Sequence, residues 1–430
     1  MNRRGFLMHS ATGAAGMTLA ASLPRNVLGA NERIRIGIVG CGGRGNFLME
    51  QTLLHAQSQN VEIGALCDVW SVNLERTAAS LGEKQTTKPR LFSRYGDLLA
   101  MDDIDAVIIA TPDFAHTPIL IDATKLRKDA FVEKPMATVL DHANEAVQQV
   151  GEAKTIVQVG NQRRSDPRHQ AAARLIQSGV LGKVSEIETA WHDRAPRWAR
   201  DYSDVRKEDV DWEQYLMFLP PEPFRPERFR RWHFYEDFTV GTPALLGAHL
   251  IDVAIWFMDD PLPRSAVAHG GVYVWKDGRE HADTLDCILE YPREFILNYS
   301  TRLGNDHPVP EAVFYGTRGT FDTQTFTARG VGGGSDALPG PITIPPNTPA
   351  PAPVAAGGAQ NALAAAQNDP RVQSDDHVLN WLECLRTRAT PTAPVEVGYA
   401  HTVASIMCFE ALKKGCRQVF DAETKAIRAG

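Results

Sequence analysis

The chain has 430 residues, with 45 Lys or Arg against 52 Asp or Glu, so its net charge at neutral pH is −7. Because a surface that follows nucleic-acid phosphates needs a basic excess, this balance argues against nucleic acid as a partner. Six cysteines in a chain of this length do not indicate a disulfide-stapled scaffold. The sequence has neither a C-x-x-C nor an H-E-x-x-H pattern, so no metal site is predicted.

The first 30 residues have the form of an export signal. Arg3 and Arg4 precede Phe6-Leu7, and an uncharged run of small and apolar residues follows over 8–23. This order is typical of a twin-arginine signal peptide, and the run is too short for a spanning helix. The sequence therefore predicts a signal peptide over 1–30, a periplasmic protein, the twin-arginine export machinery as a partner and no stable membrane insertion.

A nucleotide-binding unit begins directly after this segment. Residues 33–40 form a short apolar run that predicts a buried strand, and Gly40-Cys41-Gly42-Gly43-Arg44-Gly45 fits G-x-G-x-x-G. A predicted helix over 46–57 and a second predicted strand over 61–68 follow, and that strand ends in an acid, Asp68, 23 residues beyond Gly45. Strand, glycine turn, helix, strand and acid in this order are typical of a dinucleotide site.

Each residue of this pattern has a physical task. Gly40 permits the tight turn, Gly42 lets the backbone approach a diphosphate, and Gly45 lets the helix pack on the strand. The helix N-terminus directs free N–H groups at the phosphates. Asp68 would accept hydrogen bonds from ribose hydroxyls and repel a 2′-phosphate, and no Lys or Arg follows it immediately, so NAD is favoured over NADP.

Strands and helices continue to alternate along the next hundred residues. Predicted strands over 105–110, 130–133 and 155–160 are separated by predicted helices over 116–128 and 138–154. This alternation predicts a doubly wound parallel sheet with ligands at the carboxyl ends of its strands. Thr111, Glu133, Lys134 and Gln162 fall at such ends.

At this point four motifs together resemble the Gfo/Idh/MocA oxidoreductase family, which includes glucose–fructose oxidoreductase and inositol dehydrogenase. The motifs are Ala110-Thr111-Pro112, Glu133-Lys134-Pro135, residues 159–164 (VGNQRR) and residues 247–252 (GAHLID). The resemblance implies an α/β protein with a Rossmann domain over 31–160 and a C-terminal α+β domain over 161–322. It also implies that the second domain carries a large open, mainly antiparallel sheet, which in the family often joins subunits, so a homodimer or homotetramer is expected.

The remaining residues divide into two parts. From Arg329 to Pro370, 25 of 42 residues are Gly, Pro or Ala, so we expect a flexible or surface-wrapping insertion over 323–374. Two predicted helices follow, and the resemblance implies that residues 375–430 return to pack against the Rossmann domain.

The resemblance also assigns two catalytic residues, Lys134 and His249, which in the family flank the substrate carbon beside the nicotinamide. An ammonium next to a cationic ring would have a depressed pKa, which suits proton transfer near neutral pH. Asp252, three residues after His249, would share its helical face and could orient the imidazole. One departure stands out, because many relatives have Asp where this chain has Leu245. The predicted cofactor contacts are Gly40, Gly42, Gly43, Arg44, Gly45, Asp68, Thr111, His116, Glu133, Lys134 and Gln162.

A segment dense in aromatic residues and arginine, 209–238, suggests a carbohydrate substrate, because aromatic rings stack on sugar faces and arginine binds hydroxyls or carboxylates. A packed loop or an oligomer interface is an equally good interpretation. Glu236 or Asp237 in this segment could replace the carboxylate that is absent at Leu245. The predicted substrate contacts are Arg163, Trp191, His192, Tyr235 and Asp252.

Three functions are consistent with these residues. The first is an exported NAD(P)-dependent oxidoreductase that transfers hydride from a secondary alcohol of a sugar, a sugar derivative or a cyclitol. The alternative is a glycoside-cleaving enzyme that uses tightly bound NAD in a transient oxidation–elimination cycle. Export and Leu245 both allow this alternative. The third, a sugar-binding relative without chemistry, has only Leu245 in its favour.

Overall fold

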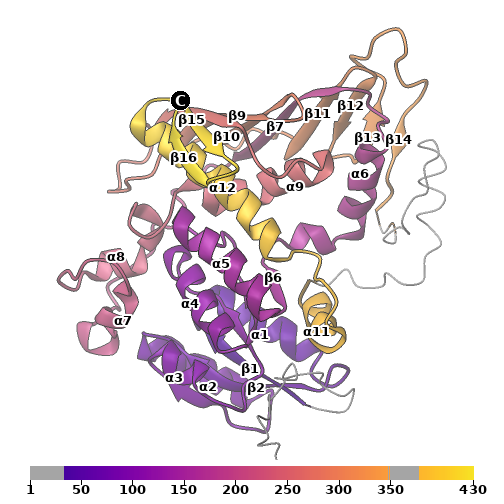
Figure 1. The fold of residues 1–430 in the computed structure, drawn as a ribbon. Coiled ribbons are helices and arrows are strands. Elements are labelled where there is room, and N and C mark those ends of the chain that lie inside the picture. Colours follow the sequence, from indigo (N-terminus) through magenta and orange to yellow (C-terminus); the bar gives the residue numbers. More distant parts are fainter. Residues whose placement is uncertain (1–32, 347, 349–376) are drawn as a thin grey trace, which may run out of the picture.

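The structure is a computed structural model that describes residues 33–346, 348 and 377–430. The predicted signal peptide over 1–30 lies outside the described residues. Two sheets form the two halves of the molecule, with the first below and the second above in Figure 1.

The first sheet has six parallel strands in the order β3-β2-β1-β4-β5-β6. The strands are β1 (Ile34–Val39), β2 (Val61–Cys67), β3 (Arg90–Phe92), β4 (Ala106–Ile109), β5 (Asp129–Val132) and β6 (Val157–Val159). Their central strands are apolar on both faces because helices cover both sides, as in parallel sheets generally. The predicted doubly wound Rossmann sheet is confirmed.

Helices from both ends of the chain enclose this sheet. Five come from the connections between strands: α1 (Gly43–Leu54), α2 (Ser71–Gly82), α3 (Tyr95–Leu99), α4 (Asp113–Lys125) and α5 (Leu140–Ala153). A sixth, α11 (His377–Thr387), comes from the C-terminal part of the chain and buries Trp381 and Leu382 against Ile36 and Ile108.

The second sheet has ten strands in the order β14-β13-β12-β11-β7-β10-β9-β8-β15-β16. Only the β7–β10 pair is parallel, so the predicted open and mainly antiparallel sheet is confirmed. The central strands are β7 (Val184–His192), β8 (Ser265–Gly271), β9 (Thr284–Tyr291), β10 (Phe295–Arg302), β11 (Ala312–Gly316) and β12 (Gly319–Asp322). Both edges are completed by β13 (Thr327–Arg329), β14 (Ile342–Thr343), β15 (Gln418–Asp421) and β16 (Ala426–Ala429).

These edge strands correct two expectations from the sequence. The predicted insertion over 323–374 begins with β13 and β14, which continue the sheet, while residues 349–376 lie outside the described residues. The C-terminal residues do more than add helices, because β15 pairs with β8. Short strands with few apolar residues give too weak a pattern to be recognised in the sequence.

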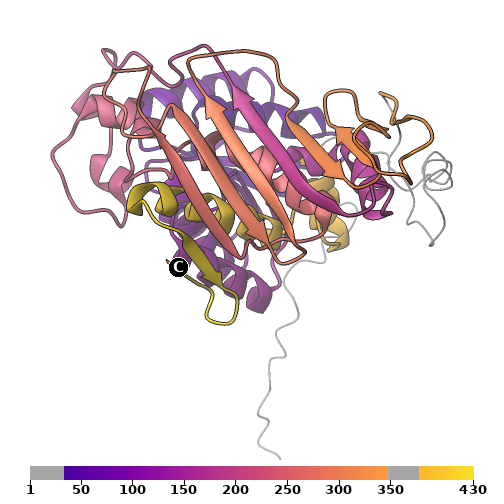
Figure 2. The same cartoon turned by 90° about the horizontal axis from the view of Figure 1, so that it is seen from above.

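Helices cover one face of the second sheet, and Figure 2 shows the other face without a described helix over it. On the covered face, α9 (Ala248–Met258) packs against β7, β10 and β11, and α6 (Pro167–Gln177) packs against α9. The long helix α12 (Val395–Lys414) contacts β8 in this half and α5 and β6 in the other, and Figure 1 shows it crossing between the halves.

Residues 193–240, between β7 and the turn before α9, form a segment that we call the strap. It contains two short α-helices, α7 (Trp212–Leu216) and α8 (Pro226–Arg230), and two 3-10 turns, η2 (Lys207–Asp209) and η3 (Trp232–Phe234). The strap belongs to the second half in sequence but attaches to the first. Val210 pairs with Trp70 after β2, and the Phe114 amide donates to the Phe238 carbonyl over 3.1 Å.

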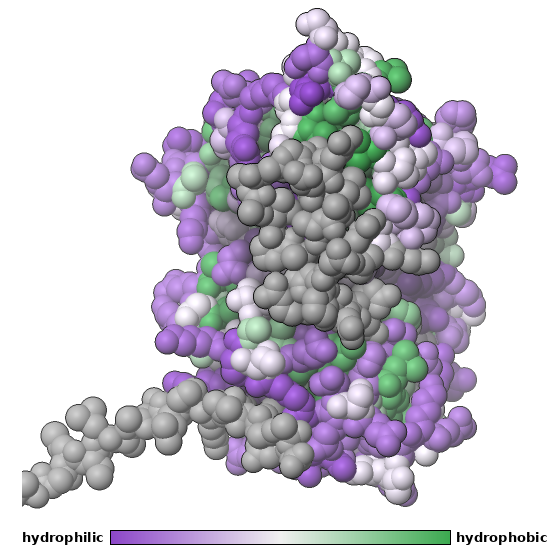
Figure 3. Space-filling model, turned by 90° about the vertical axis from the view of Figure 1, so that its right-hand side faces the viewer, coloured by the Kyte–Doolittle hydropathy of each residue, from purple (hydrophilic) through white to green (hydrophobic). Residues whose placement is uncertain are grey.

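On the side of the molecule shown in Figure 3, most of the coloured surface is hydrophilic. Hydrophobic residues gather in separate patches among the hydrophilic ones. Among the described residues, none of the helices combines the length and apolar character that crossing a bilayer requires.

The glycine turn generates the first prediction. A Cβ atom on Gly45 would lie 1.8 Å from the Gly40 carbonyl oxygen, whereas one on Gly43 would meet no atom within 4 Å. We expect Gly45→Ala to destabilise the fold by about 2 kcal/mol or more, because the clash is with backbone that cannot move aside. Gly43→Ala, in the same turn, should leave the melting temperature within a degree or two of wild type. Equal melting temperatures for the two variants would contradict this packing.

Candidate active site

A cleft of about 670 Å³ follows the carboxyl edge of the Rossmann sheet. Its inner wall consists of the glycine turn and the residues after β2 and β4, and its outer wall consists of strap residues. The charged side chains that line it are Arg44, Asp68, Arg76, Arg200 and Arg230, so its lining is strongly cationic. A cationic cleft at this edge of a doubly wound sheet suits an anionic nucleotide.

The glycine turn leaves its amides open to this cleft. Gly40 has a φ of +95°, a left-handed conformation that favours glycine. Added Cβ atoms at Gly42 and Gly43 would meet nothing within 4 Å, so both face open space, and no side chain caps the N-terminus of α1. Uncapped N–H groups at a helix start beside an open turn fit the diphosphate of a dinucleotide.

Asp68, directly after β2, lines the cleft next to the glycine turn. Its carboxylate accepts hydrogen bonds from the amides of Cys41, over 2.7 Å, and Trp70, over 2.8 Å. Burial raises the pKa of Asp68 to about 6, although both hydrogen bonds oppose the shift. Arg76, in α2, lines the same cleft. It lies eight residues after Asp68, so the residues immediately after Asp68 gave no sign of it in the sequence.

The other predicted cofactor residues divide between the cleft and its support. Thr111 lines the cleft, and its hydroxyl is buried without a hydrogen-bond partner among the described residues. Glu133 is buried and forms an ion pair with Arg44 over 2.6 Å, which joins the glycine turn to the E-K-P loop.

Two of the predicted cofactor residues lie elsewhere. His116 is buried, and its ring nitrogens lie 2.7 Å from the Pro135 carbonyl and 2.8 Å from that of Thr111. It therefore joins two loops of the site and does not line the cleft. Gln162, in η1 (Gln162–Ser165), lines a neighbouring cleft of about 660 Å³ on the far side of Arg44.

Lys134 is held by a main-chain carbonyl. It follows β5, and its Nζ donates a hydrogen bond to the Leu245 carbonyl oxygen over 2.7 Å. Leu245 belongs to η4 (Pro243–Gly247), a π-helical turn at the start of α9, and such turns are frequent at functional sites. The main chain thus contacts the lysine at the position where relatives have Asp.

Burial lowers the pKa of Lys134, and the charge of Arg44 lowers it further. The carboxylates of Asp113 and Glu133 act in the opposite direction. Asp113 lies at the start of α4, is buried, and accepts a 2.7 Å hydrogen bond from the Thr239 hydroxyl. Sequence reasoning missed Asp113, although its position directly after Thr111-Pro112 was a usable signal.

His249, on the first turn of α9, lies within electrostatic reach of Lys134. Burial holds the pKa of its imidazole well below the usual range, and the charges of Lys134, Arg163 and Arg44 reinforce the shift. The ring is therefore neutral near pH 7, when it can donate one hydrogen bond and accept another. Leu245, whose carbonyl accepts the hydrogen bond from Lys134, lies four residues before His249, so the two predicted catalytic residues come close together from the end of β5 and the start of α9.

Asp252 does not orient His249 or face a substrate. It is 1% exposed and forms a bidentate ion pair with Arg164, with bonds of 2.8 to 3.0 Å. Another imidazole, His401 on α12, is fully buried near Asp252, Arg164 and Lys134, and both its nitrogens lack hydrogen-bond partners among the described residues. The three-residue spacing predicted that Asp252 shares a helical face with His249, but it could not reveal that Arg164 pairs with Asp252.

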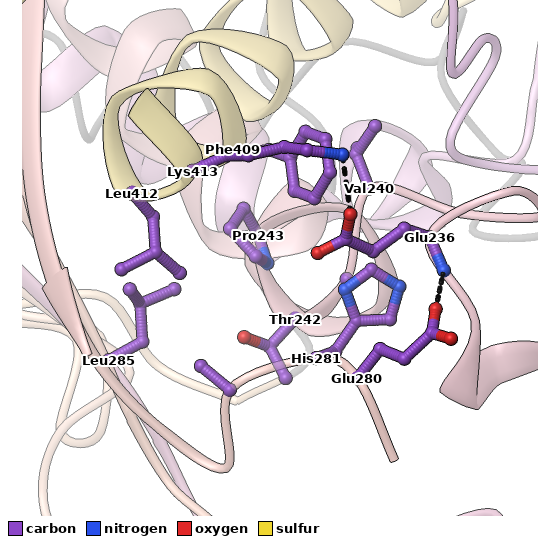
Figure 4. Close-up of a pocket in the computed structure, with 12 residues that line it drawn as sticks. Glu236, Val240, Thr242, Pro243, Glu280, His281, Leu285, Phe409, Leu412 and Lys413 are labelled. Carbon is purple, nitrogen blue, oxygen red and sulfur yellow. Dashed lines mark hydrogen bonds and ion pairs between the residues drawn. The ribbon is translucent and has the colours of Figure 1, made fainter. Parts of the chain in front are cut away.

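Neither Glu236 nor Asp237 replaces the absent carboxylate. Glu236 pairs with Lys413 over 2.5 Å, and both residues line a small cavity of about 50 Å³ (Figure 4). Asp237 pairs with Arg228 over 2.5 Å. Both carboxylates are therefore paired with cations, Glu236 with one on α12 and Asp237 with one in the strap.

The predicted substrate residues also separate. Trp191 packs, together with Trp198 and Trp232, against a cluster of Leu245, Leu246 and Leu303. Arg163 pairs with Glu311 over 2.7 Å and lines the neighbouring cleft.

The other two point away from the site. His192 lies beside Arg302 on the uncovered face of the second sheet, with 2.7 Å between its Nε2 and Nη1 of the arginine. Tyr235 is buried inside the strap, with its ring 4.6 Å from the Arg228 guanidinium carbon. The alternation of β7 continues to its last residue, so Trp191 and His192 necessarily face opposite sides.

One strap residue that sequence reasoning missed faces the site. His233 lines the dinucleotide cleft, stacks on Trp232 with 3.6 Å between ring centroids, and lies within reach of the Lys134 charge. Its position in an aromatic run hid it from sequence reasoning.

Comparisons with known proteins identify relatives of this chain by sequence and by fold. In curated sequences, the chain is 33% identical over 168 residues to an inositol 2-dehydrogenase of Rubrobacter xylanophilus, covering 39% of the chain and 46% of the relative. It is 26% identical over 237 residues to a glycosyl hydrolase family 109 protein of Shewanella baltica, covering 50% of each. The chain spans about half the length of these curated relatives.

Among solved structures, the fold is similar to the WlbA dehydrogenase of Bordetella pertussis in complex with NADH and UDP-GlcNAcA. The TM-score is 0.66 at 18% identity, with 91% of this chain and 99% of that chain covered. A levoglucosan dehydrogenase in complex with NADH and levoglucosan gives a TM-score of 0.62 at 15% identity, with 90% and 99% covered. These similarities show the fold.

Two family models match most of both halves. Residues 34–161 match the oxidoreductase family with an NAD-binding Rossmann fold, and residues 169–322 match the GFO/IDH/MocA C-terminal domain. The first match covers the glycine turn, Asp68 and Lys134, and the second covers His249. The chain therefore belongs to the Gfo/Idh/MocA family of NAD-binding oxidoreductases.

Proposed function

We propose that this protein is an NAD-dependent oxidoreductase that oxidises a secondary alcohol of a sugar, a sugar derivative or a cyclitol. The observation that carries the proposal is the hydrogen bond from Lys134 to the Leu245 carbonyl, four residues before His249, in a chain whose glycine turn lines a cationic cleft. The inositol 2-dehydrogenase relative and the two sugar-ligand structures support the substrate class. Tryptophans 191, 198 and 232 pack against the cluster that contains Leu245 and provide aromatic faces, which suit a sugar ring.

The residues of this chain divide the work as follows. When bound, NAD accepts the hydride that leaves the substrate carbon. Lys134 Nζ holds the substrate hydroxyl and accepts its proton, and the Leu245 carbonyl orients the amine by accepting one of its hydrogens. Neutral His249 holds a neighbouring substrate oxygen. Because Leu245 supplies no carboxylate, the proton leaves through Lys134 without the side-chain relay of relatives.

The experiment that tests this proposal compares wild type with Lys134→Ala, using NAD and a panel of sugars and cyclitols. We expect Lys134→Ala to lower kcat by roughly 100-fold or more, the usual scale for loss of a general base. His192→Ala, which alters the uncovered sheet face, should retain wild-type rates. The absence of nicotinamide reduction with every substrate, or equal rates for Lys134→Ala and wild type, would reject the proposal.

The pH profile should report Lys134 directly. A neutral amine is needed to accept the hydroxyl proton, so oxidation should accelerate as pH rises through the pKa of Lys134. Because burial lowers that pKa, the rise should occur below the ordinary lysine value of about 10.4. Steady-state rates between pH 5 and 10 measure it, and Lys134→Arg should lose this limb. A profile that keeps the same limb in Lys134→Arg would assign it to another group.

The choice of NAD over NADP rests in our proposal on Asp68, and it generates another prediction. Asp68→Asn removes the repulsion of a 2′-phosphate while Arg76 remains in the cleft, so the ratio of NAD to NADP affinity should fall by about tenfold or more. Adding Arg76→Gln should cancel the gain in NADP affinity. Titration calorimetry with both dinucleotides measures the ratio, and an unchanged ratio would remove Asp68 as the determinant.

A second candidate function uses the same residues differently. The glycosyl hydrolase family 109 relative and the lack of a carboxylate at Leu245 favour a glycoside-cleaving enzyme. In such an enzyme, NAD oxidises the glycoside only transiently and the hydride returns after cleavage. Glycoside cleavage without net consumption of substoichiometric NAD would establish it. Stoichiometric reduction of NAD with no cleavage would exclude it.

We also propose that the protein is exported by the twin-arginine route to the periplasm and acts as a homodimer or homotetramer. Arg3-Arg4 and the uncharged run that follows support export. The uncovered face of the second sheet, which exposes Val267, Ile288 and Ile296, supports self-association.

A further inference from the structure

The dinucleotide cleft contains more positive charge than its own side chains neutralise. Of its charged lining residues, Arg44 is paired with Glu133, and the Asp68 carboxylate is occupied by two backbone amides. In the described part of the chain, Arg76, Arg200 and Arg230 have no carboxylate within ion-pair distance. Two of these three, Arg200 and Arg230, come from the strap and not from the Rossmann domain.

The two strap arginines act on each other. Burial and the charge of Arg230 both lower the pKa of the Arg200 guanidinium, which places the two cations within electrostatic reach. Arg230 lies over the indole of Trp70, 5.0 Å from the ring centroid, directly after β2. Two like charges in a shared cleft repel each other, and an anion between them removes that cost.

The strap that carries them is attached firmly to the Rossmann domain. The Asp211 amide donates to the Val69 carbonyl over 2.8 Å, and the Thr239 hydroxyl donates to the buried Asp113 carboxylate over 2.7 Å.

Aromatic contacts join the same elements along the length of the cleft. Phe114 packs against Tyr215 and Phe238, with ring centroids 5.6 and 5.2 Å apart, and Trp70 packs against Phe229. Hydrogen bonds and aromatic contacts therefore both hold the strap to the Rossmann domain beside the cleft.

We propose that the strap is the outer wall of the dinucleotide site. Arg200 and Arg230 bind the anionic diphosphate linkage from the side opposite the glycine turn. This inference rests on the proposed function, because it requires that the cleft binds a dinucleotide.

The test measures dinucleotide binding to the full chain, with NADH fluorescence as the signal. The double variant Arg200→Gln/Arg230→Gln should bind NADH about tenfold or more weakly than wild type and release it correspondingly faster. Arg206→Gln, an exposed arginine of the same strap outside the cleft, is the matched control and should leave both constants unchanged. A chase with excess NAD measures the release rate.

A second pair of substitutions separates charge from folding. Arg200→Lys/Arg230→Lys keeps both charges and should keep most of the affinity for NADH, so a loss in the glutamine pair alone assigns the effect to charge. Affinity of the glutamine pair within twofold of wild type would overturn the strap proposal and leave the proposed function intact. Wild type that binds neither NADH nor NADPH would overturn both.

Discussion

The hydrogen bond from Lys134 Nζ to the Leu245 carbonyl is the contact on which the candidate site depends. It joins the end of a Rossmann strand to the π-helical turn that begins α9 in the other half of the molecule. It also sets the chemical state of the site, because a carbonyl holds an amine without adding a negative charge. Burial can then lower the pKa of Lys134, which a carboxylate side chain at position 245 would oppose.

Around this contact, side chains that are distant in sequence pair with one another and support the site. The Glu133–Arg44 ion pair fixes the E-K-P loop to the glycine turn, and Asp113 binds the strap through Thr239. The Arg164–Asp252 pair fixes α9 to η1. A buried pair of this kind contributes more to position than to stability, because its desolvation offsets much of its attraction. The catalytic side chains are thereby placed by elements distant in sequence.

The sequence was informative where chemistry and local pattern coincide. Buried strands followed by glycine or an acid identified the Rossmann sheet, and the family motifs located Lys134 and His249. Residues predicted from a single element were less reliable, since His192 lies on the wrong face of β7 and Asp252 is paired with Arg164. Asp113, His233 and His401 act across elements, so only the folded chain brings them to the site.

The strap extends this account from the reacting groups to the cofactor. Its arginines complete a cleft whose inner wall alone carries the family pattern, and its aromatic anchors are buried against Phe114 and Trp70. The aromatic segment that suggested a sugar site in the sequence thus has two roles. One part packs the strap against the Rossmann domain, and the other, at Trp198 and Trp232, lies beside Leu245 where a substrate would sit.

The most direct test of the central claim is an experimental structure of the full chain with NAD bound. The account predicts the diphosphate between the glycine turn and the strap arginines, with the nicotinamide ring next to Lys134 and His249. A dinucleotide bound elsewhere, or a nicotinamide ring out of reach of both side chains, would contradict it.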